Sequence, residues 1–251
     1  MKIISWNVNG LRAVFKKNFL EWFKKENADI FCLQEIKAQE GQIPEALVNP
    51  AGYFSYFSFA LKKGYSGVAV YTKEKPLAVE KKLGLKRFDE EGRFLRLEYK
   101  DFILINLYMP NGGQEKENLS YKLETYNYLL EYLEKIKEKP LVLAGDFNIA
   151  YKEIDLAEPE KNQDSIMFTP EERRQIDRLV ELGFTDIFRK LHGDEVGKYT
   201  WWSYFSLSRD RNLGWRIDYV FTSKDITGKI KNAFILPQVW GSDHCPAGIE
   251  I

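Results

Sequence analysis

The sequence predicts an α/β domain in which two packed β-sheets are covered by helices on their outer faces. Predicted strands cluster in two groups, and amphipathic helices separate them. That arrangement is typical of packed sheets with helices outside. The chain has 251 residues, of which 44% are hydrophobic, which suits one large core or two small ones. Because no linker, low-complexity stretch or tandem repeat interrupts the chain, we interpret residues 1–251 as a single domain.

The first part of the chain combines one helix with several short strands. Phe15, Phe19, Trp22 and Phe23 share one face at helical spacing, which predicts a helix over residues 11–27. Short apolar or aromatic runs bounded by turn residues predict strands. They cover residues 3–6, 30–33, 53–59 and 68–71, with an irregular segment over 37–52.

Two further helices are predicted in the rest of the chain. Apolar residues at helical spacing indicate one over residues 115–139. A second, over 170–182, follows a capping box in which Thr169 is the N-cap, Pro170 the first helical residue and Glu172 the reciprocal partner. The strands predicted here cover residues 94–99, 102–107, 141–144, 218–221 and 245–251, with a charged connection over 83–93.

Two stretches outside these elements are candidates for function. A polar run from Asn148 to Met167 is long for a structureless connection inside a compact domain, and such loops are often functional. Residues 201–216 interleave aromatic rings with arginines, which suits stacking against bases or sugars between phosphate contacts. An ordinary aromatic strand with a charged hairpin is a slightly simpler interpretation of that composition.

Composition leaves the class of partner open. Lysine and arginine total 37, as do aspartate and glutamate, so net charge neither indicates nor excludes nucleic acid. Cys32 and Cys245 lie in apolar strand contexts, which favours buried thiols in a cytosolic protein over a disulfide. The sequence has no apolar window of about 18 residues and no signal peptide, so we expect a cytoplasmic protein without a membrane partner.

Polar side chains mark the ends of the predicted strands. Some strands end on them, and two later strands begin with them. The ends are Asn7, Glu35, Tyr108 and the pair Asp146 and Asn148, and the beginnings are Asp218 and the pair Asp243 and His244. If the two later strands run antiparallel to the others, all these groups meet at one edge of the sheets. Carboxylates gathered there repel one another, and a divalent cation is the simplest way to hold them.

This set of residues suits hydrolysis of a phosphodiester. Glu35, with Asn7 and Asp243 near it, would hold Mg²⁺ or Mn²⁺, the ions that an oxygen-rich, thiol-free set favours. Asp146 would deprotonate a water, and Asn148 would hold that water or a phosphate oxygen. Taken alone, the Gly-Asp-x-Asn sequence at 145–148 could equally be an Asx-type turn after a strand.

The chain has only two histidines, and their contexts differ. His192 lies at a helix end and is interpreted as a surface residue. His244, with its other ring nitrogen held by Asp218, could donate a hydrogen bond to a phosphoryl oxygen in the transition state. Tyr108 could hydrogen-bond to the phosphate as well.

Six motifs follow one another from residue 5 to residue 246. They are SWNVNGLR at 5–12, LQE at 33–35, GYSG at 64–67, GDFN at 145–148, GWRIDY at 214–219 and GSDHCP at 241–246. In this content and order the sequence resembles exonuclease III-type apurinic/apyrimidinic endonucleases. Leu-Gln-Glu and Ser-Asp-His are shared by the wider superfamily, which includes deoxyribonuclease I, sphingomyelinases and inositol-polyphosphate phosphatases. The GWRIDY motif and the segments 154–156 and 168–173 are more specific to the repair branch.

The resemblance implies a four-layer α-β-β-α sandwich of the deoxyribonuclease I type. It implies Mg²⁺-dependent hydrolysis of double-stranded DNA on the 5′ side of an abasic site, leaving a 3′-hydroxyl and a 5′-deoxyribose phosphate. Trimming of 3′ blocking groups and some 3′→5′ exonuclease activity are also implied. We expect a monomer that acts on DNA inside the cell.

The resemblance also assigns roles to individual residues. Asp146, Asn148, Tyr108, Asp218 and His244 match catalytic positions, and Glu35, Asn7 and Asp243 match metal-binding positions. The positions that match DNA-contacting residues are Arg12, Tyr65, Arg93, Asn111, Asn162, Trp201, Trp215 and Ile217. Among these, Trp201, Trp215 and Ile217 match the lining of a pocket for the extruded abasic sugar, and flipping is least costly where the base is missing.

The sequence departs from the family pattern at a few positions. Asn9 stands where some members have Asp, and Gly113-Gln114 where some relatives carry a basic side chain that enters the duplex. Ser165 and Met167 replace residues that are often Asn and Gly. Two other functions stay open at this point: a phosphodiesterase acting on a lipid or inositol head group, and a non-catalytic DNA-binding module.

Overall fold

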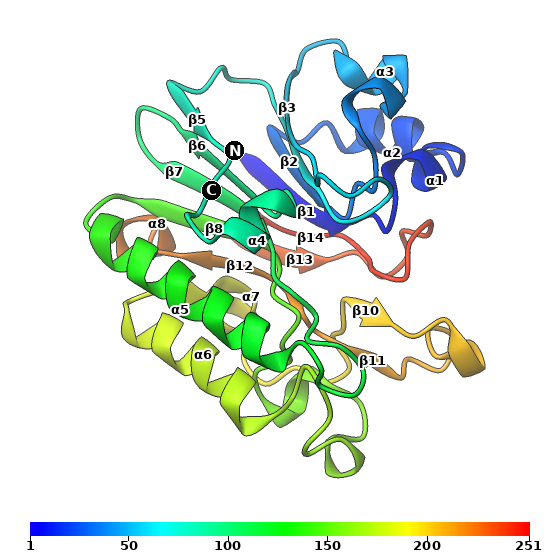
Figure 1. Cartoon of the computed structure of the whole chain (residues 1–251), viewed down its shortest axis with the longest axis vertical. Helices are drawn as coiled ribbons and strands as arrows, with labels where there is room; N and C mark the ends of the chain where they lie inside the picture. Colours follow the sequence, from blue (N-terminus) through cyan, green and yellow to red (C-terminus); the bar gives the residue numbers. More distant parts are fainter.

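Two six-stranded sheets form the middle of the protein in the computed structural model, which describes residues 1–251. Figure 1 shows the two sheets lying one on the other, with helices on both outer sides. The first sheet has the order β13 (Asn232–Ile235), β14 (Ala247–Glu250), β1 (Lys2–Asn7), β2 (Ile30–Gln34), β4 (Val68–Thr72), β3 (Phe54–Ser58). The second has the order β5 (Ala78–Glu80), β6 (Phe94–Glu98), β7 (Ile103–Tyr108), β8 (Leu141–Asp146), β12 (Asp218–Thr222), β9 (Thr185–Asp186).

Strand β8 shows why its sequence is a continuous apolar run. Successive side chains of a strand point to opposite faces of the sheet. Val142 and Ala144 belong to the core between the two sheets, whereas Leu141 and Leu143 belong to the core beneath the helices. A strand that is covered on both faces is therefore apolar throughout.

The helices cover the two outer faces. The helices are α1 (Leu11–Phe15), α2 (Phe19–Glu26), α3 (Glu45–Val48), α4 (Lys86–Glu90), α5 (Leu119–Ile136), α6 (Pro170–Glu181), α7 (Ile187–His192) and α8 (Lys224–Thr227). Apolar residues of α5 and α6 pack on the second sheet, and those of α1 and α2 pack on the first. The predicted four-layer α-β-β-α sandwich is confirmed (Figure 1).

Strand directions agree with the condition on which the predicted site depends. Strand β1 pairs in parallel with β2, and β7 pairs in parallel with β8. Strand β12 is antiparallel to β8, and β14 is antiparallel to β1. The carboxyl ends of β1, β2, β7 and β8 and the beginnings of β12 and β14 therefore lie at one edge of the sandwich.

Several element boundaries differ from the prediction. The helix predicted over 11–27 is divided into α1 and α2, because Asn18 has a left-handed backbone with φ of 67°. The helix predicted from residue 115 begins at Leu119, after positive φ values at Gly113 and Lys116. The connection predicted over 83–93 contains the short helix α4.

Other elements were not predicted. The edge strands β5 and β13 carry mixed polar sequences, so period-two apolar patterning does not mark them. The aromatic region, by contrast, forms a two-stranded hairpin of β10 (Trp201–Trp202) and β11 (Gly214–Trp215), which agrees with its interpretation as an aromatic strand with a charged hairpin. The hairpin projects from the body of the protein in Figure 1. The long polar loop contains two short 3₁₀ helices, Glu153–Asp155 and Pro159–Lys161.

Cys32 and Cys245 are buried and unpaired, as predicted. None of the helices combines the length and the apolar character that crossing a membrane would need.

Candidate active site

Neighbouring strands bring the predicted catalytic residues into register. Tyr108 lies opposite Asp146 in the parallel pair of β7 and β8, and Asp218 lies opposite Asp146 in the antiparallel pair of β12 and β8. Gly145 permits this approach, because a Cβ atom there would lie 1.9 Å from the carbonyl oxygen of Leu107. The glycine in the Gly-Asp-x-Asn motif is thus a requirement of strand packing.

Asn7 joins the two sheets at this edge. Its Nδ2 donates to Glu35 Oε1 at 2.9 Å and to Asp146 Oδ2 at 2.8 Å. Its Oδ1 accepts from the backbone N–H of Asn9 at 3.0 Å, which fixes the orientation of the amide. The side chain is fully buried, so these contacts replace all its contacts with water. Asn7 therefore places one carboxylate of each sheet next to the other.

His244 and Asp218 form the predicted pair. His244 Nδ1 lies 2.8 Å from Asp218 Oδ2, and His244 Nε2 lies 3.9 Å from Asp146 Oδ2. Burial alone would lower the pKa of His244, but the charge and hydrogen bond of Asp218 outweigh it and raise the pKa to about 10. The histidine is therefore a cation at neutral pH, with Nε2 directed at the second carboxylate.

The two carboxylates respond to this environment in opposite directions. Burial, followed by repulsion from Asp218, raises the pKa of Asp146 to about 7. For Glu35, burial is outweighed by Lys37, Asn7 and Tyr108, and the pKa lies below its usual value. Lys37 Nζ lies 2.7 Å from Glu35 Oε2, so the two side chains form an ion pair.

A divalent cation fits this edge. Ligand atoms of Glu35, Asp146 and His244 all lie within 4.8 Å of one another. The set consists of carboxylate oxygens and one ring nitrogen without a thiolate, which suits Mg²⁺ or Mn²⁺. Asp218 Oδ1 is buried without a hydrogen-bond partner, and three carboxylates here face His244 and Lys37, so negative charge is in excess. We call Asn7, Glu35, Asp146, Asp218 and His244 the reaction centre.

Asp243, predicted as a metal ligand, has other partners in this structure. Its Oδ1 accepts from Asn9 Nδ2 at 2.9 Å, and its Oδ2 accepts from Trp201 Nε1 at 3.1 Å. The structure brings Glu35 and Asn7 together, as predicted, and adds Asp146 and His244 in place of Asp243. A role of Asp243 in holding the metal stays a prediction.

Comparison with known proteins identifies the family. A family model described as "Endonuclease/Exonuclease/phosphatase family" matches residues 4–244. The chain belongs to this family. It is 45% identical to an exodeoxyribonuclease of Bacillus subtilis (strain 168) over 253 residues, covering 100% of this chain and 99% of the relative. It is 43% identical to the DNA repair nuclease APEX1 of Danio rerio over 249 residues, covering 98% of this chain and 80% of the relative.

Solved structures agree with this assignment. An AP endonuclease from Archaeoglobus fulgidus superposes with a TM-score of 0.91 at 31% identity, covering 100% of this chain and 98% of that one. A 3′ phosphatase NExo from Neisseria, bound to product DNA hairpin, gives a TM-score of 0.91 at 30% identity, covering 100% and 98%. The resemblance to apurinic/apyrimidinic endonucleases that the motifs indicate is confirmed.

A buried lysine that the sequence did not reveal as functional fixes the backbone next to the reaction centre. Lys122 of α5 is fully buried and forms an ion pair with Glu172. Its Nζ also donates to the backbone oxygens of Asn148 at 2.6 Å and Asn111 at 3.0 Å. Asn148 in turn donates from Nδ2 to the oxygen of Met109 at 2.8 Å. The available signal was spacing, because Lys122 shares the buried stripe of α5.

The positions that match DNA-contacting residues of the family divide by exposure. Arg12 and Asn111 are exposed, and Tyr65, Asn162, Trp201 and Trp215 are partly exposed. Arg93 and Ile217 are only 2% and 1% exposed in this structure, and their contact with DNA stays a prediction. The resemblance had placed both among the contact positions.

An aromatic wall lies next to the reaction centre. Trp201 and Trp215 pack edge to face with ring centres 6.4 Å apart, and Trp201 lies 6.5 Å from the His244 ring. Phe168 and buried Ile217 pack beneath these rings in one small apolar cluster. We call Trp201 and Trp215 the aromatic wall. The β10–β11 hairpin carries both rings, and residues of the long polar loop pack beneath them.

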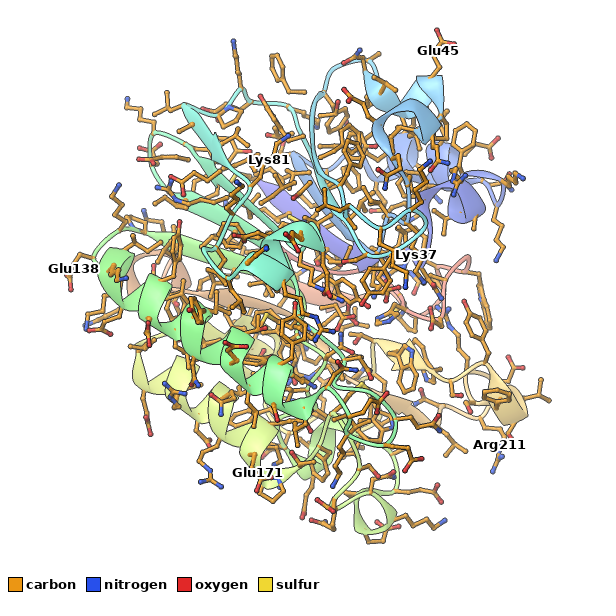
Figure 2. The ribbon with its side chains drawn as sticks, in the orientation of Figure 1. Lys37, Glu45, Lys81, Glu138, Glu171 and Arg211 are labelled. Carbon is orange, nitrogen blue, oxygen red and sulfur yellow. The ribbon has the colours of Figure 1, made fainter.

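A basic cleft includes Lys37, the lysine that contacts Glu35 of the reaction centre. It has a volume of about 440 Å³ and is lined in part by Arg12, Lys16 and Lys37. In the view of Figure 2, Lys37 lies between the α1–α3 region and the β10–β11 hairpin, which carries Arg211. Lys37 also contacts Glu35, so this residue links the cleft to the reaction centre.

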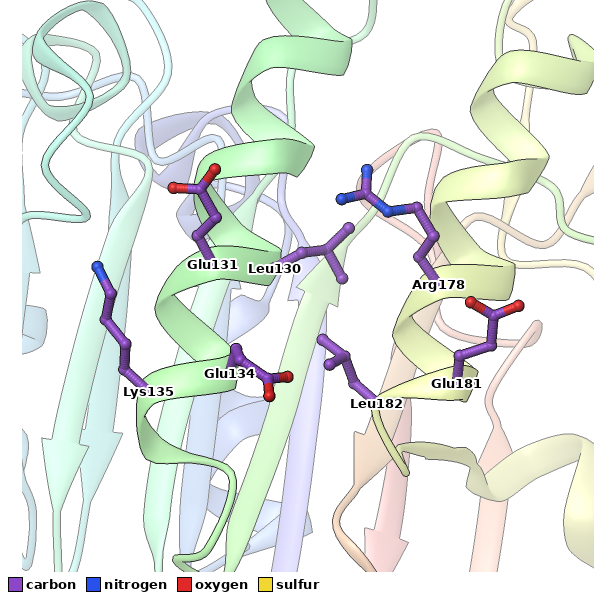
Figure 3. A pocket seen from close by; sticks show the side chains of 7 residues that line it. All are labelled: Leu130, Glu131, Glu134, Lys135, Arg178, Glu181 and Leu182. Atoms are coloured by element: carbon purple, nitrogen blue, oxygen red, sulfur yellow. The ribbon is translucent and has the colours of Figure 1, made fainter.

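A second cleft lies between α5 and α6. Figure 3 shows that Glu131 and Glu134 of α5 and Glu181 of α6 surround Leu130 and Leu182 there. Lys135 and Arg178 also line the cleft, so three carboxylates face two cations, and the excess negative charge does not favour a phosphate.

Proposed function

We propose that the protein is a metal-dependent DNA repair nuclease that hydrolyses the phosphodiester 5′ to an abasic site in double-stranded DNA. The cut would leave a 3′-hydroxyl, and 3′-phosphodiesterase and 3′→5′ exonuclease activities would accompany it. The observation that carries this proposal is the joining of Glu35, Asp146 and His244 across two sheets. We propose that the protein acts as a monomer inside the cell.

The broad class, a nuclease of DNA repair, follows from the family and from the relatives reported above. Names of relatives include exodeoxyribonuclease, DNA repair nuclease and AP endonuclease. The preference for abasic sites in this chain is inferred from the motifs and from the aromatic wall.

Mg²⁺ or Mn²⁺ is the proposed cofactor. Glu35 would hold the ion, with Asn7 orienting the carboxylate and Asp243 close by. When bound, the ion would neutralise phosphate charge and offset the repulsion among the carboxylates. Lys37 already contacts Glu35 as a cation, which supports the inference that this acid attracts positive charge.

Asp146 is the proposed base for the attacking water. Its Oδ1 accepts the backbone N–H of Asn148 at 2.8 Å, and its Oδ2 is fixed by Asn7. Burial and Asp218 raise the pKa of Asp146, so this carboxylate has an increased affinity for a proton. Asn148 would hold the water or a phosphate oxygen, and Lys122 fixes the backbone of Asn148.

His244 and Tyr108 would contact the phosphate. Asp218 binds the Nδ1 side of His244, which leaves the Nε2–H free to donate to a phosphoryl oxygen. Tyr108 ends β7 opposite Asp146, so its hydroxyl can donate at the same edge. Both donors would stabilise charge that develops on the phosphate in the transition state.

The substrate preference is proposed to come from the aromatic wall. Trp201 and Trp215 would pack against the extruded sugar, since a nucleotide without a base is the least costly to rotate out of the stack. Arg12 and the basic cleft would bind the phosphate backbone on the side of Lys37, and Asn111 and Asn162 would bind it on the other.

The decisive experiment uses a labelled duplex that contains one tetrahydrofuran abasic analogue. This analogue cannot undergo β-elimination, so a single cut must be hydrolysis. We expect a nick immediately 5′ to the analogue with Mg²⁺, and no nick with EDTA or with an intact duplex. Absence of the nick would contradict the proposal, and hydrolysis of an inositol phosphate in the same buffer would move the protein to the phosphatase branch.

A further inference from the structure

Glu91 and Arg93 lie directly behind two tyrosines. The proposed function places Tyr108 against the phosphate, and Tyr65 matches a DNA-contacting position of the family. Glu91 follows α4, and Arg93 precedes β6. Tyr65 belongs to the loop between β3 and β4 of the first sheet, and Tyr108 ends β7 of the second. Arg93 is only 2% exposed, so it can act on a substrate chiefly through the residues that it contacts.

A single guanidinium orients both tyrosines. Arg93 Nη2 donates to the Tyr65 hydroxyl at 3.0 Å, and Nη1 donates to the backbone oxygen of Tyr108 at 3.1 Å. The Arg93 Cζ atom lies 4.3 Å from the centre of the Tyr108 ring, within the range of a cation–π contact. The relative position of the two rings therefore depends on where this guanidinium is held.

Glu91 holds it. Glu91 Oε2 accepts from Arg93 Nε at 2.5 Å and from the Tyr121 hydroxyl at 3.1 Å. Glu91 Oε1 accepts from Arg87 Nε at 3.1 Å. Glu91 is thus bonded to α4 and α5 as well as to Arg93, and these contacts fix the plane of the arginine fork.

The backbone between Glu91 and Arg93 is held as firmly as the side chains. Gly92 has a φ of 61°, and a Cβ atom on it would lie 2.5 Å from the carbonyl carbon of Phe59. Only glycine fits this close approach to the chain that follows β3. Glu91 and Arg93 are therefore locked in place between the two sheets.

We propose that Glu91 is a positioning residue, which holds Arg93 and through it aims Tyr65 and Tyr108 at the substrate. This inference rests on the proposed function, because it takes Tyr108 to contact the phosphate and Tyr65 to contact the DNA. A carboxylate near bound DNA weakens binding by repulsion, so electrostatic attraction does not explain its presence. The hydrogen bonds of Glu91 with Arg93, Tyr121 and Arg87 explain its presence.

The test compares Glu91→Gln with Glu90→Gln. The control removes the same charge from an exposed neighbour that has no contact with Arg93. On the tetrahydrofuran duplex, Glu91→Gln is expected to lower kcat between about tenfold and hundredfold, because misplacement of reacting groups has effects of that size. KM should be unchanged or lower, since one repulsive charge is gone. Glu90→Gln should cleave like the wild type.

A double-mutant cycle separates positioning from general damage. If Glu91 acts through Tyr108, the effects of Glu91→Gln and Tyr108→Phe should be strongly non-additive, with little further loss in the double variant. Arg93→Lys, which keeps the charge but loses the fork, should show the same fall in kcat. Circular dichroism and thermal unfolding would establish that each variant is folded.

The outcomes distinguish the two proposals. If the wild type does not cut the abasic duplex, the proposed function fails. If the wild type cuts and folded Glu91→Gln has an unchanged kcat, or if the two single effects multiply in the double variant, the positioning role of Glu91 is overturned.

Discussion

Two clusters of buried carboxylates lie next to each other in this protein and are balanced in opposite ways. One is the reaction centre, which includes Asp218. The other, which we call the arginine cluster, consists of Asp155, Asp186, Arg189 and Arg216. Arg216 and Asp218 are separated only by Ile217, so both clusters include a residue at or just before the beginning of β12.

The arginine cluster is balanced in charge, with two carboxylates and two guanidinium groups, although Arg216 Nη1 is buried without a hydrogen-bond partner. Arg216 donates from Nε to Asp155 at 2.8 Å and from Nη2 to Asp186 at 2.7 Å, and Arg189 donates to Asp155 at 2.7 Å. Burial would raise the pKa of Asp155, but Arg216 and Arg189 outweigh it and lower the pKa. Each charge in this cluster has an opposite charge beside it.

The reaction centre lacks that balance. Glu35, Asp146 and Asp218 face one buried histidine and one lysine, and the pKa of Asp146 is raised to about 7 by burial and by Asp218. The comparison teaches that burial of acids by itself does not mark an active site. What marks it is negative charge that the fold leaves without a partner, where a metal ion and a substrate can supply the missing positive groups.

The largest expected effect is the loss of activity in Asp146→Asn. The amide keeps the shape but cannot accept the proton of the water, so cleavage should fall by roughly 10³-fold or more. The free energy of unfolding without metal should be equal or higher, because a neutral group relieves the repulsion from Asp218. Single-turnover cleavage and urea unfolding measure both quantities.

The matched control for that variant is Asp101→Asn, in the exposed turn between β6 and β7. It should change neither cleavage nor stability. Near-normal cleavage by folded Asp146→Asn would remove this residue from the reaction, and a large loss of stability would show that the reaction centre is not strained.

Arg216→Met should have the opposite profile. Asp186 loses its only arginine and Asp155 loses one of two, so the free energy of unfolding should fall by about 3–5 kcal/mol. Urea unfolding measures this loss, and cleavage per folded molecule at low temperature should change far less than in Asp146→Asn. Arg211→Met, at an exposed position of the hairpin loop, serves as the control. If Arg216→Met lowered the free energy of unfolding by less than about 1 kcal/mol, the comparison of the two clusters would be contradicted.

Divalent metal should stabilise the folded protein through the reaction centre. At a concentration of 100 times its Kd, an ion that binds only the folded state adds about 2.7 kcal/mol to the free energy of unfolding. Thermal unfolding with Mg²⁺, against NaCl of equal ionic strength, should show this gain in the wild type and lose it in Glu35→Gln. An equal gain in both proteins would place the ion elsewhere.

The smallest effect concerns pH and belongs to the arginine cluster. The pKa of Asp155 is lowered in the folded state from the value of 3.8, so its contribution to stability is fully present above about pH 4. That contribution should disappear as pH falls through the lower folded pKa. Urea unfolding between pH 6 and pH 3 is expected to show a loss of at most about 1 kcal/mol from this group, with a shallower slope in Asp155→Asn. Equal slopes would contradict the assignment.

Much of the reaction centre could be predicted from the sequence. The short strands of both sheets end or begin on polar residues, and their directions then bring those residues to one edge. Asn7, Glu35, Asp146, Asp218 and His244 were all identified in this way, because strand ends are read from a local pattern. The motifs added the family and the four layers.

The partners of these residues could not be predicted. Glu91 lies on a segment interpreted as a charged connection, and Lys122 lies on a predicted amphipathic helix. The contacts of both come from elements far apart in the chain. The same holds for Arg93, whose burial and contacts with Tyr65 and Tyr108 no local pattern indicates, and its contact with DNA stays a prediction.

The sequence by itself determined which chemical groups the protein has, where its strands and main helices lie, and to which family it belongs, because these depend on periodicity and local motifs. Only the tertiary structure decided which charges are neutralised. Asp155 and Asp146 both belong to family motifs, yet one faces two arginines and the other faces acids. Charge balance depends on which side chains from distant segments come within a few ångströms, because in a buried site of low effective dielectric those neighbours dominate the electrostatic energy.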